Sequence, residues 1–76
     1  MITRHCHIKD LGSLMSFMSR IGVDKFKRIT MNEHTYNHLA INHQGFVFGC
    51  ESFDIELEIN PSAPDYIIEY CYEEED

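Results

Sequence analysis

The chain has 76 residues and a net charge of −7, and 43% of its residues are hydrophobic. This length accommodates one domain with a small core, which leaves little room for a deep catalytic cleft and disfavours an enzyme. The hydrophobic content argues against disorder, and no apolar run is long enough for a membrane span or a signal sequence. We therefore expect a cytoplasmic, non-enzymatic protein in which residues 1–76 form a single domain.

Seven elements are predicted along the chain from hydrophobic periodicity and from the turn residues between apolar segments. Their order is β-α-β-α-β-β-β. The expected ranges are, in chain order, 2–8, 11–21, 26–31, 33–40, 46–48, 53–60 and 66–72. The fold class is therefore α+β, with a mainly antiparallel sheet, two short helices on one face, and a meander of the last three strands.

The two helices are predicted from their capping residues. Asp10 is a typical N-cap and Gly22 a typical stop for the helix over residues 11–21, whose apolar side chains recur at helical spacing. Asn32 caps the second helix, and Glu33 lies favourably in its first turn. We expect the apolar stripe of the first helix to pack on the sheet.

The second half of the chain is predicted to be mostly strand. Residues 46–48, Phe-Val-Phe, indicate a short buried strand that bends into a hairpin at residues 49–52. Residues 53–60 alternate apolar and polar side chains, which is typical of a half-buried strand. A last strand over 66–72 leads into an acidic tail over 73–76.

Charge is divided sharply between the two parts of the chain. Residues 1–31 hold all six basic residues and two acids, a charge of +4, whereas residues 32–76 hold eleven acids and no Lys or Arg, a charge of −11. Such a division in a small domain predicts a strongly negative surface region.

Alternate acidic residues on the predicted strand 53–60 share one face. They are Asp54, Glu56 and Glu58, and Glu69 and Glu73 of the last strand and the tail extend the row. Carboxylates so close together repel each other unless something basic meets them. Two interpretations stay open: a solvated face that keeps the protein soluble, or a docking face for a basic, nucleic-acid-binding partner, where the acids imitate phosphates.

The basic residues Lys25, Lys27 and Arg28 form a small cluster. The net negative charge disfavours direct binding of nucleic acid, so the cluster is interpreted as a counter-charge for the acidic part, in the same fold or in a second copy. A molecule with two charged parts can associate head to tail or across a two-fold axis. A homodimer is therefore a further option, and the tyrosine-rich last strand suits an interface.

Histidines and cysteines supply the candidate metal and catalytic groups. His5 and His7 share a strand face, and His34 and His38 are spaced as two ligands on one helix face, but no further ligand has a diagnostic spacing. The cysteines, Cys6, Cys50 and Cys71, are widely spaced, which favours reduced thiols over a disulfide framework. No metal and no cofactor are expected. A metal-dependent or thiol-dependent enzyme is the weakest of the functional hypotheses.

A stretch of about half the chain resembles part of the capsid fold of tailed phages. In that pattern a strand ends in a Met-Asn turn, a short helix begins, and a hairpin and a proline loop follow. The matching residues are Ile29, Met31, Asn32, Thr35, Tyr36, Leu39, Gly45, Phe48, Gly49, Ile55, Pro64 and Ile68. The chain departs from this family in lacking its long helix and extended arms. The resemblance implies a phage origin.

Small acidic phage proteins include inhibitors of host factors, such as anti-CRISPR proteins, glycosylase inhibitors and polymerase inhibitors, which this chain resembles in size and charge. The leading hypothesis is therefore a non-enzymatic inhibitor in the host cytoplasm, which binds a basic, nucleic-acid-processing partner through Asp54, Glu56, Glu58, Glu69 and Glu73. The alternative is a small structural protein that assembles with itself through its two charged parts.

Overall fold

The structure is a computed structural model that describes residues 2–72, so the predicted tail over 73–76 lies outside the described residues. It has an α+β fold, as predicted, with one α-helix and one 3-10 helix more than the sequence indicated. Its elements are, in chain order, β1 (Ile2–Ile8), α1 (Leu11–Ile21), the 3-10 helix η1 (Val23–Lys25), β2 (Phe26–Met31), α2 (Glu33–Asn42), α3 (Gln44–Ser52), β3 (Glu56–Ile59) and β4 (Tyr66–Tyr72).

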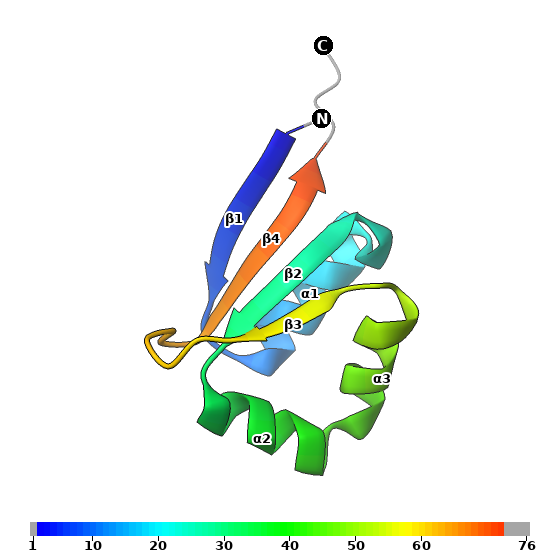
Figure 1. Ribbon diagram of the computed structural model, residues 1–76. Helices are drawn as coiled ribbons and strands as arrows, with labels where there is room; N and C mark the ends of the chain where they lie inside the picture. Colours follow the sequence, from blue (N-terminus) through cyan, green and yellow to red (C-terminus); the bar gives the residue numbers. More distant parts are fainter. Residues whose placement is uncertain (1, 73–76) are drawn as a thin grey trace.

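The strands form a mixed sheet in the order β1-β4-β2-β3 (Figure 1). β4 runs antiparallel to β1 and β2, whereas β2 and β3 are parallel. The predicted meander is therefore wrong, since β4 inserts between β1 and β2 and β3 lies at an edge. The reason is the connection from β2 to β3, because its two helices return the chain to the end of the sheet where β2 began.

The predicted helix over residues 11–21 is confirmed as α1, and its caps are the predicted residues. The Asp10 carboxylate accepts a hydrogen bond from the Ser13 amide at 2.8 Å. Gly22 ends the helix at a φ of 105°, where a residue with a β-carbon is strained. Local sequence signals are therefore sufficient to define this helix.

The second helix, α2, begins at Glu33 as predicted and extends two residues beyond the predicted end, to Asn42. The Asn32 side chain accepts a hydrogen bond from the Thr35 amide at 2.8 Å and donates one to the Ala63 carbonyl at 3.1 Å. One residue thus caps α2 and holds the loop before β4 against it.

The predicted strand over residues 46–48 and hairpin over 49–52 are wrong, because this segment is the helix α3. A strand would bury Phe46 and Phe48 on one face. In α3 the side chains of Phe46, Val47 and Cys50, at helical spacing, pack against the core, and Phe48 is 63% exposed. Tertiary packing overrides the strand preference of the Phe-Val-Phe sequence.

The predicted strand over residues 53–60 is shorter in the structure. Asp54 has a φ of 57°, in the left-handed region, and this turn separates α3 from the extended chain that starts at the buried Ile55. The strand β3 covers only Glu56–Ile59. Its alternation persists, since the Leu57 side chain packs against the core and those of Glu56 and Glu58 do not.

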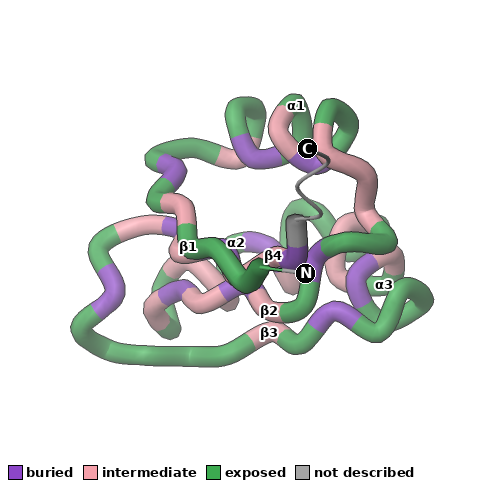
Figure 2. The backbone as a smooth tube through the Cα atoms, turned by 90° about the horizontal axis from the view of Figure 1, so that it is seen from above, coloured by how far each residue is buried: buried purple, intermediate pink, exposed green. Residues whose placement is uncertain are grey.

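All three α-helices contribute to one core on one face of the sheet. Leu14 and Met18 of α1, Leu39 of α2 and Cys50 of α3 are buried with Ile29, Met31 and Ile68 of the strands. In Figure 2 the buried positions of α1 lie on the side of the helix that faces the sheet. The opposite face of the sheet is not covered by any described helix (Figure 1).

Candidate functional site

The uncovered face of the sheet is the candidate site, and we call it the open face. Side chains alternate between the two faces of a strand, so the residues between the core-facing ones lie on the open face. They are His5 and His7 of β1, Ile67 and Glu69 of β4, Arg28 and Thr30 of β2, and Glu56 and Glu58 of β3. Every strand of the described sheet therefore contributes to the open face.

Four charged or ionisable side chains form a row across the strands, which we call the charge row. The backbone register pairs His5 with Glu69, Glu69 with Arg28, and Arg28 with Glu56. His5 Nε2 lies 3.1 Å from Glu69 Oε1, and Arg28 Nε donates to Glu56 Oε2 at 3.0 Å. Bases and acids thus alternate from β1 to β3.

A second set of polar contacts lies beside the charge row. Arg28 Nη1 donates to Glu58 Oε2 at 3.4 Å, and the Thr30 hydroxyl donates to the same oxygen at 3.1 Å. His7 Nε2 lies 3.2 Å from Asp65 Oδ2, just before β4 begins. These contacts hold the carboxylates of the open face in defined positions.

Arg28 is the central charge of the open face. The carboxylates of Glu56 and then Glu58, and more weakly Glu69, raise the pKa of its guanidinium above the ordinary value, so it stays charged. The open face and its rim hold four carboxylates, those of Glu56, Glu58, Glu69 and Asp65, and one guanidinium, which leaves these groups with a charge of −3 while the histidines are neutral. The site remains net acidic.

The predicted acidic residues do not form an uninterrupted row. Glu56, Glu58 and Glu69 share the open face as predicted, but β2 and its Arg28 lie between β3 and β4. Asp54 is not on β3, because its left-handed backbone places it in the turn before the strand. Glu73 lies outside the described residues.

The sequence did not indicate that Asp65 belongs to the site. It also left open whether Arg28 would pair with acids of the same chain or of a second copy. The structure places Arg28 against acids of the same chain, one of the two options that the basic cluster indicated. The contact joins residues 28 positions apart along the chain, and only the pairing of β2 with β3 brings them together. No local pattern in the sequence encodes that pairing.

The other predicted candidates lie elsewhere. On α2, His38 Nδ1 lies 3.3 Å from the side-chain nitrogen Nδ2 of Asn42, and the centroids of the His38 and His43 rings are 5.6 Å apart. Within residues 2–72, no group of three or more His, Cys, Asp or Glu side chains is arranged to hold a metal ion. Cys50 and Cys71 are buried thiols and Cys6 is half-buried.

An apolar groove lies between α1 and α3 on the other side of the molecule from the open face. Its volume is about 340 Å³, and its walls include Met15, Met18, Phe46, Phe53 and Cys50. Burial raises the pKa of the Cys50 thiol to about 11, so this thiol carries its proton at neutral pH and is a poor nucleophile. The groove therefore offers hydrophobic surface without a reactive group.

Comparisons of this chain with protein-family models, with curated proteins and with solved structures gave no match. None of the helices in the described part of the chain has the length and apolar character needed to cross a membrane.

Proposed function

We propose that this protein is a non-enzymatic, phage-type inhibitor that binds a basic, nucleic-acid-binding host protein through the open face of its sheet. The observation that carries the proposal is the cluster of carboxylates from Glu56, Glu58, Glu69 and Asp65 on a face that no described helix covers. A surface of this charge complements the Lys and Arg side chains of a nucleic-acid groove.

The contacts within the open face support binding because they hold the carboxylates in place before a partner arrives. Oε2 of Glu56 and Oε2 of Glu58 each accept a hydrogen bond from Arg28, and Oε1 of Glu69 faces Nε2 of His5. The second oxygen of each carboxylate is then the acceptor for a partner's basic side chain. Groups that are already positioned lose less conformational entropy on binding.

The test is capture of partners from a bacterial lysate by the tagged full chain, at low and at high salt, followed by competition of the recovered protein with duplex DNA and with RNA. We expect a nucleic-acid-binding protein that is released at high salt, because charge pairs at an accessible surface are screened. We also expect nucleic acid and this chain to compete for it.

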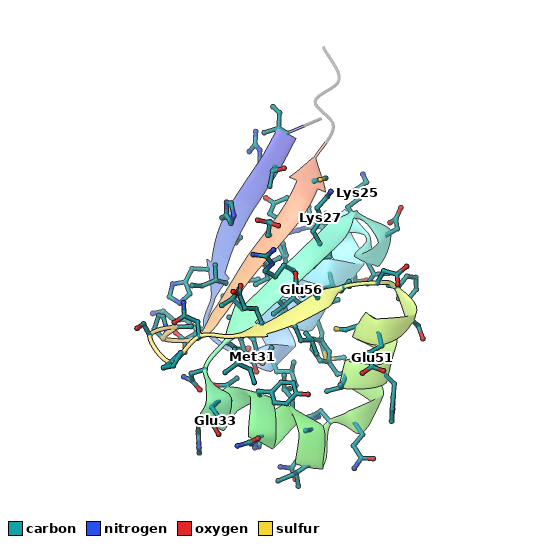
Figure 3. The ribbon with its side chains drawn as sticks, viewed as in Figure 1. Lys25, Lys27, Met31, Glu33, Glu51 and Glu56 are labelled. Atoms are coloured by element: carbon teal, nitrogen blue, oxygen red, sulfur yellow. The ribbon has the colours of Figure 1, made fainter. Side chains whose placement is uncertain are left out.

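A matched pair of variants makes the test specific to the open face. Glu58→Gln with Glu69→Gln removes two acids from that face, and Glu33→Gln with Glu51→Gln removes two exposed acids from the helices, away from the sheet (Figure 3). We expect the face variant to bind about ten-fold more weakly or worse, and the helix variant to bind like the original protein. Equal binding by both variants contradicts the proposal.

A further inference from the structure

The two edges of the sheet have opposite chemical character. β1, at one edge, has seven residues, with Arg4, His5 and His7 and no acid. β3, at the other edge, has four residues, with Glu56 and Glu58 and no base. An edge strand is a template for pairing with another chain, and charged side chains on it decide which chain is accepted.

The directions of the two edge strands match. β1 and β2 both run antiparallel to β4, and β3 runs parallel to β2, so β1 and β3 point the same way. A second copy placed beside the first in the same orientation therefore brings its β1 next to β3 as a parallel neighbour. Both copies then keep their open faces on the same side of the extended sheet.

The charge row has a base at one edge of the sheet and an acid at the other, so a second copy placed beside the first would continue it. It runs from His5 at one edge, through Glu69 and Arg28, to Glu56 at the other edge. His5 of the next copy would follow Glu56, so bases and acids would still alternate. His7 follows His5 by two residues, and Glu58 follows Glu56 by two residues. When Glu56 faces His5 of the next copy, Glu58 therefore faces His7 of that copy.

We propose that copies of this chain join edge to edge, with β3 of one copy pairing in parallel with β1 of the next. Glu56 then meets His5 of the next copy, and Glu58 meets His7. The side chains retain atoms for this contact: Nε2 of His5 and of His7 faces Glu69 and Asp65, and in the imidazolium form the Nδ1–H group also donates and meets the carboxylate of the next copy. This inference needs no second protein and goes beyond the proposed inhibitor function.

Pairing of β1 with β1 of another copy fits the charges less well. An antiparallel pair of this kind places Arg4, His5 and His7 of one copy near the same three residues of the other copy, and neither strand contains an acid. Like charges across a strand pair are destabilising. The parallel contact joins two different surfaces, so each added copy leaves a free β1 edge and a free β3 edge and growth continues.

The first experiment is sedimentation velocity of the purified full chain from micromolar to millimolar concentration, at about pH 8 and about pH 6, where histidine side chains gain charge. His5 faces Glu69 of β4, and His7 faces Asp65. We expect an average mass that rises beyond that of a dimer with concentration, rises further at the lower pH, and falls with salt. A monomer under all these conditions overturns the inference.

Two double variants test which edges meet. Glu56→Gln with Glu58→Gln blocks the β3 edge, and His5→Gln with His7→Gln blocks the β1 edge. Each variant alone should remain a monomer, whereas an equimolar mixture should form one-to-one dimers and nothing larger. Dimers of the Glu56→Gln, Glu58→Gln variant alone would show pairing of β1 with β1 and overturn the proposed contact. The control, Glu33→Gln with Glu51→Gln, should assemble like the original protein.

Discussion

The Arg28 side chain links two carboxylates of the open face. Its Nε and Nη1 atoms donate to Glu56 and Glu58, at 3.0 and 3.4 Å. A planar guanidinium has several N–H groups in a fixed fork, so one side chain meets two carboxylates, which the single ammonium group of a lysine does less well. The acids of β3 therefore lie close together without the repulsion that their spacing alone predicts.

Cys50 provides a prediction of how stability depends on pH. Burial, with a smaller effect of the Glu51 carboxylate, raises the pKa of its thiol from 9.0 to about 11. Between these values the folded chain keeps a proton that the unfolded chain loses, so the free energy of unfolding falls as the pH rises. We expect Cys50→Ala to reduce the slope of this fall in denaturation experiments from about pH 8 to about pH 11.

The control for Cys50 is Cys6→Ala, which changes the half-buried thiol of β1. This variant shows what the loss of a cysteine side chain does to the denaturation experiment by itself. Either cysteine variant can lower stability at every pH by removing packed atoms, so the slope and not the absolute stability is the measurement. Identical slopes for Cys50→Ala and the original protein would contradict the effect assigned to burial.

At the scale of elements, α3 shows how packing decides between helix and strand. The segment contains Gly45 and Gly49, which are unfavourable in a helix, together with three residues that favour strands. It is helical because this conformation brings Phe46, Val47 and Cys50 to the core together. The gain from burying these side chains outweighs a local preference of about 1 kcal/mol per glycine.

The helical assignment predicts that Gly49→Ala stabilises the protein. Apart from its chain neighbours and the backbone of its own helix, no atom lies within 4 Å of a β-carbon added at Gly49, and alanine is the better helix former. We expect the free energy of unfolding to rise by about 0.5–1 kcal/mol, measured by chemical denaturation. A loss of stability would instead favour the tight turn that the sequence predicted over residues 49–52.

Gly22→Ala is the opposite case and serves as the control. Gly22 has a φ of 105°, and an added β-carbon would lie 3.0 Å from an Asp24 carboxylate oxygen. We expect this variant to lose about 1–3 kcal/mol, the usual cost of a strained backbone conformation. Both variants replace glycine by alanine, so a difference in sign isolates the backbone conformation as the cause.

At the scale of the whole molecule, the two differently charged parts of the chain interleave in the sheet. The basic part, residues 1–31, supplies β1 and β2, and the acidic part supplies β3 and β4. The order β1-β4-β2-β3 alternates between them, so each strand pairing in the described sheet joins one part to the other. Cross-strand ion pairs follow directly from this topology.

This interleaving predicts that neither part of the chain forms the sheet by itself. Peptides of residues 1–31 and 32–76 should each lack strand structure in circular dichroism, because each contains strands without their partners. An equimolar mixture should regain the strand signal at high concentration, and salt should weaken the recovery since opposite charges favour association. A stable sheet in either peptide alone would contradict the observed strand order.

Four elements could be predicted from the sequence with their observed boundaries: β1, α1, β2 and β4. Their signals are local. Asp10 and Gly22 cap α1, and the strand over 66–72 alternates side chains and follows a proline loop. The shared face of Glu56 and Glu58 could also be predicted, because side-chain alternation along a strand requires no knowledge of its neighbours. The position of Glu69 on the same face depends on the pairing of β4 with β2.

The α+β class, the caps of α1 and α2, and the acidic character of residues 32–76 could all be inferred from the sequence. The helical state of residues 44–52, the place of β4 between β1 and β2, and the contacts of Arg28 with Glu56 and Glu58 emerge only in the folded chain. The two groups of features differ in the range of the interactions that create them. Caps and alternation involve residues a few positions apart, whereas strand order and burial depend on contacts between distant segments, which are formed by the chain as a whole.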